Sequence, residues 1–227
     1  MKLWDKGSTP DAQMDLFTVG NDRELDQLLV KYDLKASRAH AEMLGAIGIL
    51  DKGETDAILG ELDRMLEEAE SGNFAIEPPF EDMHSKIEFE LIQRLGNAGK
   101  KIHTARSRND QVLTALQLYL KDALLDFRNQ VGGLFELLLD LAETHKEVIL
   151  PGYTHLQVAM PSSFGLWFSA YAESLVDDTF LLRAAFQVAD QNPLGSAAGY
   201  GSSFPIDRAL TTERMGFATQ KFNVVAA

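Results

Sequence analysis

The stretch QVLTALQLYLKDALLDFRNQVGGLFELLLDLAETHK, from Gln111 to Lys146, decides the fold of this chain. It contains no proline, and only Gly132-Gly133 weakens it as a helix. Apolar residues recur in it at helical spacing: Val112, Leu116, Leu120, Leu124, Val131, Phe135, Leu138 and Leu141. At about 1.5 Å per residue, such a helix would span on the order of 50 Å. That length is typical of a helical bundle and not of a compact α/β domain.

A second long helix is expected after this one. Pro151-Gly152 breaks the first pattern, and Pro161 can open the next helix in its first turn. Residues 162–190 then carry a second apolar series: Leu166, Phe168, Leu175, Phe180, Leu182 and Phe186. The two segments therefore predict a pair of long antiparallel helices.

Shorter helices are predicted on either side of this pair. Residues 22–70 read as helix with a break near residues 51–53, where Thr55 is the N-cap of the second part or lies in its first turn. A further helix runs from about Asp82 to Leu95 and stops at Gly96, and a last one opens near Asp207.

No alternation of apolar and polar residues bounded by turns marks a strand, so the predicted fold class is all-α. We predict an N-terminal helical domain over residues 1–105, followed over residues 106–227 by the first long helices of a central helical bundle. Several helix faces are apolar over a greater width than one partner helix covers. Burial by further helices or by other subunits is therefore expected.

The charge of the chain limits its partners. The formal net charge is −13 and the isoelectric point is near 4.8, which argues against nucleic acid and anionic membranes as partners. An anionic substrate would require a local cationic cluster. There is no cysteine, no apolar run long enough to span a membrane and no signal peptide, so a cytoplasmic protein is expected.

The segment Thr104-Ala105-Arg106-Ser107-Arg108-Asn109-Asp110 is a candidate for that cationic cluster. It lies just before a long helix, where backbone N–H groups and guanidinium groups bind carboxylates or phosphates. The alternative is simple capping, in which Ser107, Asn109 or Asp110 caps the helix and the arginine side chains are solvated. The residues alone leave the two readings about equally supported.

A second candidate is Gly152-Tyr153-Thr154-His155-Leu156-Gln157, in the turn between the long helices. His155 could transfer a proton near neutral pH, held by the neighbouring hydroxyl and amide groups. A single histidine is more often a structural residue.

Two further segments are less specific. His84 and Glu88 stand one helical turn apart in EDMHSKIE, but no second histidine supports a metal site, so a polar helix face is the favoured interpretation. The glycines of NPLGSAAGYG, from Asn192, fit either a backbone carboxylate site or a tight connection. We expect no metal and no cofactor.

Taken in order, these segments resemble the fumarase/aspartase superfamily of lyases, and within it most closely the argininosuccinate lyase family. The resemblance covers essentially the whole chain and rests on five segments: KLW at Lys2, EDMHSKIE at Glu81, HTARSRNDQV at His103, LPGYTHLQVAMP at Leu150 and NPLGSAAGYG at Asn192. Any one segment is weak, but five in the same order are specific.

The resemblance implies a β-elimination of argininosuccinate to arginine and fumarate, as in arginine biosynthesis, without a cofactor. It implies that Ser107, Arg108 and Asn109 bind substrate. It implies the same for Thr154, His84 and Gln157, while His155 is a catalytic acid or base or tunes one. It further implies homotetramers in which different subunits complete each active site.

The chain departs from the family pattern at several positions. Gly20 stands where the family usually has a substrate-binding serine, and Ala105 and Ala197 replace usual glycines. The G-S-S-x-M-P-x-K-x-N loop, which carries the family's catalytic serine, would lie beyond Ala227. We therefore expect this chain alone to be an inactive N-terminal portion of the enzyme. The alternatives are a non-catalytic, crystallin-like structural homologue and a related fumarate-releasing lyase such as adenylosuccinate lyase.

Overall fold

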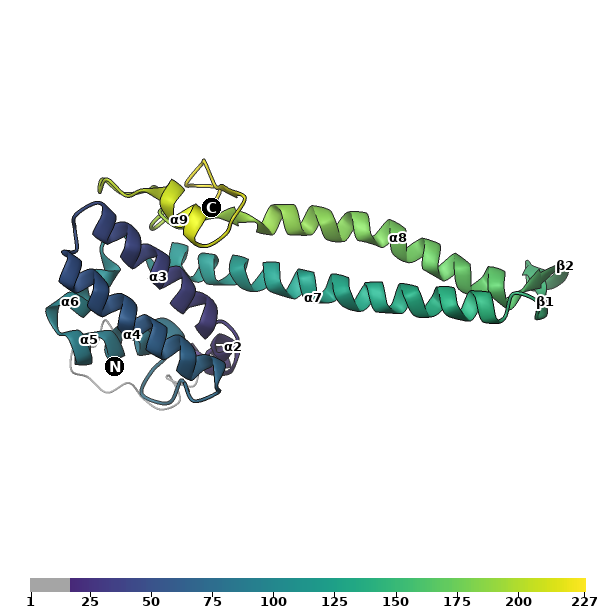
Figure 1. Cartoon of the computed structure of the whole chain (residues 1–227), viewed down its shortest axis with the longest axis horizontal. Coiled ribbons are helices and arrows are strands. Elements are labelled where there is room, and N and C mark those ends of the chain that lie inside the picture. Colours follow the sequence, from purple (N-terminus) through teal and green to yellow (C-terminus); the bar gives the residue numbers. More distant parts are fainter. Residues whose placement is uncertain (1–16) are drawn as a thin grey trace. The chain divides into compact units, whose positions relative to one another are not determined.

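The computed structural model describes residues 17–227, so the KLW segment at Lys2 lies outside the described residues. The described chain forms two compact units, one from residues 17–119 together with 190–227 and the other from Leu120–Ala189. Helices dominate both units, which confirms the predicted fold class (Figure 1). The domain division between residues 105 and 106 stays a prediction. Within residues 17–227, no helix combines the length and the apolar content that crossing a bilayer requires.

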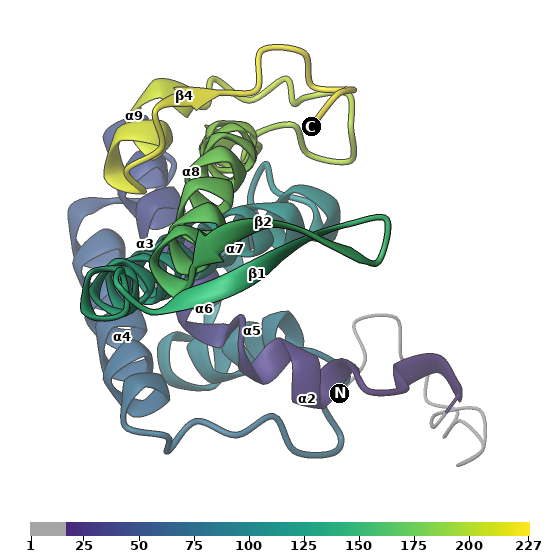
Figure 2. The ribbon, with the colours of Figure 1, turned by 90° about the vertical axis from the view of Figure 1, so that its right-hand side faces the viewer.

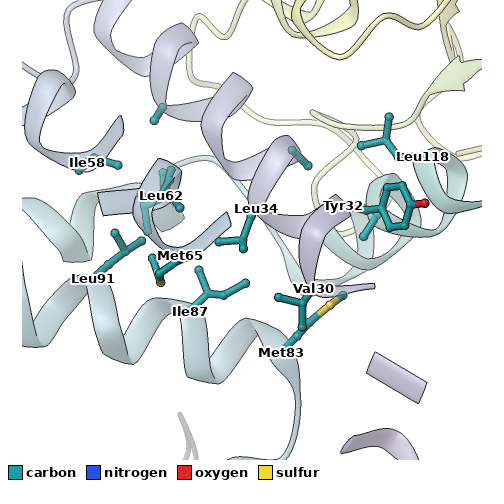
Figure 3. Close-up of a cluster of buried hydrophobic side chains, with 14 of the residues drawn as sticks. Val30, Tyr32, Leu34, Ile58, Leu62, Met65, Met83, Ile87, Leu91 and Leu118 are labelled. Carbon is teal, nitrogen blue, oxygen red and sulfur yellow. The ribbon is translucent and has the colours of Figure 1, made fainter. Parts of the chain in front are cut away.

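The first unit is built from short and medium helices. They are α2 (Asp22–Gln27), α3 (Val30–Ala46), α4 (Lys52–Glu70), α5 (Met83–Leu95), α6 (Asn97–Lys100), the 3-10 helix η1 (Lys101–His103), the start of α7 (Arg108–Thr144) and α9 (Arg208–Arg214). A two-residue parallel pairing joins β3 (Gln191–Asn192) to β4 (Thr219–Gln220). The core lies between α3, α4 and α5, where Leu34, Leu62 and Ile87 point toward one another (Figure 3).

Local capping explains where these helices begin and end. Asp51, and not Thr55, is the N-cap of α4, and it forms a reciprocal capping box with Glu54. The Asp82 side chain accepts a hydrogen bond from Ser85 N at the start of α5. That helix ends at Gly96, whose φ of 58° favours glycine. The prediction for this helix is therefore confirmed to within one residue.

A buried histidine in α3 makes the stability of the first unit depend on pH. His40 is 2% exposed, and its Nε2 lies 3.0 Å from the carbonyl oxygen of Thr104. Burial, with the nearby Arg106 charge, lowers the pKa of His40 from 6.5 to about 3. The folded chain therefore stays neutral at this position while the unfolded chain binds a proton below pH 6.5.

We expect acid to destabilise the chain through His40. The free energy of unfolding should fall as the pH drops below 6.5, by at most about 1.4 kcal/mol per pH unit. His40→Gln keeps a donor for Thr104 O and cannot titrate. Between pH 7 and 5, urea unfolding of the wild-type chain should lose about 2 kcal/mol more than that of the variant. Equal losses in the two proteins would show that His40 does not cause the dependence.

The second unit is a helical hairpin. Residues of α7 from Leu120 onward run antiparallel to α8 (Phe164–Ala189), as predicted, and a β-hairpin joins the two helices (Figure 1). At the joint the helices approach closely. A Cβ added to Gly165 would lie 2.8 Å from the Ala142 carbonyl oxygen and 2.7 Å from Lys146 Cα. Only glycine fits there without displacement of the backbone.

The hairpin corrects the prediction that the chain has no strands. β1 (Ile149–Thr154) pairs antiparallel with β2 (Gln157–Ser163), as Figure 2 shows. Pro161 lies opposite Pro151 in this ribbon instead of opening a helix, and α8 begins at Phe164. Both strands are edge strands, which tolerate proline. Because the strands are largely exposed, no face needs the apolar alternation that the prediction relied on.

The second unit has a large apolar surface in this single chain. Its exposed large apolar side chains on the two helices include Leu134, Leu137, Leu166, Trp167, Phe180 and Leu181. Leu181 is 74% exposed. An exposed apolar surface of this kind is typical of an interaction site.

Candidate functional site

The start of α7 is held by reciprocal capping bonds. The Ser107 Oγ accepts a hydrogen bond from Asn109 N at 3.3 Å, and Asp110 Oδ1 accepts one from Ser107 N at 2.9 Å. The capping alternative is therefore realised for Ser107 and Asp110. These capping bonds use only one of the two carboxylate oxygens of Asp110.

The second oxygen of Asp110 fixes the glycine-rich segment. Asp110 Oδ2 accepts hydrogen bonds from Gly195 N and Ala197 N, both at 2.9 Å. Backbone N–H groups of NPLGSAAGYG thus bind a carboxylate, as one of its two readings proposed, but this carboxylate belongs to the chain itself. Burial raises the pKa of Asp110, while the three amide donors and Arg106 oppose this rise.

Two alanines occupy backbone conformations that favour glycine. Ala105 has a φ of 60° and Ala197 a φ of 52°. Both stand where the family that the sequence resembles usually has glycine. A Cβ in the left-handed region costs roughly 1–2 kcal/mol. Ala197 itself donates one of the bonds to Asp110, and Ala105 lies two residues before Ser107, which donates another. The chain therefore retains these contacts against local strain.

Relief of this strain should stabilise the chain. In Ala105→Gly and Ala197→Gly, the gain of roughly 1–2 kcal/mol is partly offset by the larger entropy of glycine in the unfolded chain. We expect a net increase in the free energy of unfolding of about 0.5–1 kcal/mol for each, measured by urea denaturation. Ala57→Gly in α4, with helical geometry, should instead lose about 1 kcal/mol. A loss at all three positions would contradict the strain argument.

The two arginines of the segment are not both solvated. Arg106 is 7% exposed and donates from Nη1 to Ser37 Oγ at 2.8 Å. The Arg108 side chain is 28% exposed, and its Nη2 lies 3.5 Å from Glu88 Oε2. Burial lowers the pKa of Arg108, and the charges of Asp82 and Asp33 oppose that change. The solvated-arginine alternative is therefore wrong for Arg106, and Arg108 is partly open to solvent.

His84 is buried beside a carboxylate. It is 2% exposed, and its Nδ1 lies 3.2 Å from Asp33 Oδ2 without the geometry of a hydrogen bond. Within residues 17–227, neither ring nitrogen of His84 has a hydrogen-bond partner, and neither has Arg106 Nε. Because a buried polar atom without a partner costs roughly 1–3 kcal/mol, such atoms mark a place that a further group can complete.

Both carboxylate oxygens of Glu88 face side chains other than His84. Glu88 Oε1 lies 2.8 Å from His103 Nδ1, and its other oxygen faces Arg108. The described part of the chain holds no cluster of three histidine or acidic side chains suited to a metal ion. Both His84 and Glu88 are buried, and their interpretation as a polar helix face stays a prediction.

His155 lies in the two-residue turn of the β-hairpin. The turn is closed by the pair Thr154 and Gln157, and its central residues, His155 and Leu156, have φ values of 49° and 64°. Such a turn favours Asn-Gly and places strain on bulky residues. His155 is exposed, and Leu156 is 97% exposed. The turn therefore presents His155 to solvent in a strained backbone.

The seven predicted site residues fall into two groups. His84, Ser107, Arg108 and Asn109 belong to the first unit, whereas Thr154, His155 and Gln157 belong to the second. Their roles in binding or catalysis remain predictions.

The sequence interpretation missed the polar residues that support the first group. Asp33, Ser37 and His40 are all buried in α3 at helical spacing. The available signal was three polar side chains on one helix face between apolar residues: a carboxylate, a hydroxyl and an imidazole. The prediction for residues 22–70 rested on apolar spacing and capping residues, neither of which indicates buried polar side chains.

Comparisons with known proteins agree on one family. Residues 7–227 match the family described as Lyase. Argininosuccinate lyase of Parabacteroides distasonis is 54% identical over 226 residues, which cover 100% of this chain and 51% of that protein. The argininosuccinate lyase of Phocaeicola vulgatus is 53% identical with the same coverage. A crystal structure of EDDS lyase matches with a TM-score of 0.78 at 28% identity, covering 96% of this chain and 43% of that one. The chain spans about half the length of the curated relatives it matches.

Proposed function

This chain belongs to the lyase family, and we propose that it is the N-terminal portion of an argininosuccinate lyase that eliminates fumarate from argininosuccinate. The observation that carries the proposal is the identity of 54% to argininosuccinate lyase of Parabacteroides distasonis, spread over the whole chain. In the proposed reaction, a base takes a proton from the carbon beside a carboxylate of the substrate. The bond from carbon to the guanidinium nitrogen then breaks, that nitrogen gains a proton, and arginine and fumarate leave.

The local chemistry of the first unit supports this proposal. The substrate carries carboxylates, and a chain with a net charge of −13 repels them unless donors are gathered locally. Arg108 is partly exposed at the start of α7, beside Ser107 and Asn109. The unpartnered ring nitrogens of His84 supply further hydrogen-bonding capacity. Preorganised donors of this kind stabilise the negative charge that develops during elimination.

The second unit supplies a candidate for proton transfer. His155 is presented by a strained turn, with Thr154 and Gln157 beside it. An imidazole can both accept and donate a proton, so it can carry the proton that elimination moves. We assign His155 this role, as acid or base or as the residue that tunes one, and assign Thr154 and Gln157 to substrate contact.

Assembly and location complete the proposal. The exposed apolar side chains of α7 and α8 would be buried in a homotetramer whose subunits share active sites around a central bundle. The proposed location is the cytoplasm. The matched relatives are about twice as long as this chain, which supports a longer protein.

The test compares this chain with the full product of its gene. Both proteins are incubated with argininosuccinate, and fumarate and arginine are quantified. We expect the full-length protein to form the two products in equal amounts and residues 1–227 alone to form neither. A full-length protein that binds argininosuccinate but never releases fumarate would favour the non-catalytic alternative.

A further inference from the structure

A buried carboxylate that the sequence interpretation missed contacts two elements of the candidate site. Asp33 lies in α3 and is completely buried. It contacts Gln111 of α7 and lies beside His84 of α5. Asp33 therefore connects three helices at the point where the predicted substrate-binding residues of the first unit gather.

The geometry at Asp33 is that of an acceptor. Gln111 Nε2 lies 3.0 Å from Asp33 Oδ1 and 3.1 Å from Oδ2, so both oxygens face the same amide group. Burial raises the pKa of Asp33, whereas Arg106, the bond from Gln111 and Arg108 oppose the rise. A carboxylate at this position leaves the Gln111 amide one favourable orientation, with its nitrogen toward Asp33.

The other end of the same amide faces Arg108. Arg108 Nη1 lies 3.4 Å from Gln111 Oε1. Because a guanidinium can only donate, the amide oxygen must face it. Asp33 thus fixes the Gln111 amide, and the amide in turn presents an acceptor to Arg108.

Arg108 is restrained on a second side by Glu88. Its Nη2 lies 3.5 Å from Glu88 Oε2, and the other oxygen of Glu88 lies 2.8 Å from His103 Nδ1. A guanidinium carries five N–H donors, so two long contacts leave capacity for an anion. The side chain is 28% exposed, which leaves part of it accessible.

We propose that Asp33 is a positioning residue: through Gln111 it orients the Arg108 guanidinium toward a carboxylate of the substrate. The inference rests on the proposed function, because it takes Arg108 as a substrate-binding residue. Asp33 itself does not touch the substrate. Its effect reaches the substrate through two consecutive hydrogen-bonded contacts, Asp33 to Gln111 and Gln111 to Arg108.

The sharpest test exchanges the two partners in the full-length protein. Asp33→Asn removes the carboxylate, and Gln111→Glu places two carboxylates against each other. The double variant Asp33→Asn/Gln111→Glu keeps one negative charge in the pair. The new asparagine amide can donate to the new glutamate carboxylate, whose second oxygen still faces Arg108. We expect each single variant to raise KM for argininosuccinate about 10- to 100-fold, the range for a lost bond to a charged group, with a smaller change in kcat. The double variant should restore KM to within about threefold of the wild type.

A second cycle separates positioning from stability. In an Arg108→Met background, Asp33→Asn should leave KM unchanged, because the group that it orients is gone. Thermal unfolding of every variant is measured in parallel. If Asp33→Asn raises KM by the same factor with and without Arg108, or only lowers the unfolding temperature, the proposal is wrong. A double variant that stays folded without recovery of KM, or that does not fold, also rejects it.

The wild-type control separates failure of the positioning role from failure of the proposed function. Absence of fumarate release by the wild-type full-length protein would reject the proposed function. Normal wild-type release with an unchanged KM in both single variants would reject the positioning role alone.

Discussion

Replacement of His155 by asparagine should lower turnover of argininosuccinate by the full-length protein about 100- to 10,000-fold. Loss of general acid–base assistance usually costs this much. Asparagine suits the test because it tolerates the left-handed backbone that His155 adopts, with a φ of 49°. The turn should therefore persist, and the loss can be attributed to the imidazole. The measurement is kcat from initial rates of fumarate formation.

The neighbouring residue of the same turn provides the control. Leu156 has a φ of 64°, so Leu156→Gly relieves strain in the hairpin and keeps the imidazole. We expect its kcat to stay within a few-fold of the wild type. If His155→Asn retains a near-normal kcat, His155 has no part in the mechanism.

Replacement of Asp110 by asparagine should lower the stability of the first unit by about 3 kcal/mol. Asp110 is completely buried and accepts bonds from the backbone N–H groups of Ser107, Gly195 and Ala197. The asparagine amide nitrogen would face at least one of these donors, and a buried donor without an acceptor costs roughly 1–3 kcal/mol. Loss of the negative charge among three donors adds to this cost. Urea unfolding of the chain measures the change.

The matched control makes the same substitution in the same helix. Asp126 of α7 accepts an exposed bond from Gln130 at 2.7 Å, so Asp126→Asn should change the free energy of unfolding by less than about 0.5 kcal/mol. A loss below about 1 kcal/mol in Asp110→Asn would mean that the 195–197 segment does not depend on this carboxylate.

The helices were predictable because their signals are local. Asp82 and Gly96 bound α5, whose observed range, Met83–Leu95, differs from the prediction by one residue. The long apolar series likewise placed α7 and α8 to within a few residues. Helical periodicity and capping act over a few residues and are visible in a single sequence.

The features that were missed depend on distant or unusual contacts. Gln111 is 78 residues from Asp33, and Gly195 is 85 residues from Asp110, so no local pattern indicates either pairing. The β-hairpin was missed because its exposed strands carry Pro151 and Pro161 and lack apolar alternation. Sequence alone thus indicated the candidate segments but not the buried carboxylates that hold one of them in place.

The most direct test of the proposed function is a comparison of two substrates with the purified full-length protein. The value of kcat/KM is measured for argininosuccinate and for adenylosuccinate from initial rates of fumarate release, with His155→Asn as the reference for residual activity. We predict turnover of argininosuccinate and none of adenylosuccinate above that reference. Release of fumarate from adenylosuccinate, with none from argininosuccinate, would contradict the proposal.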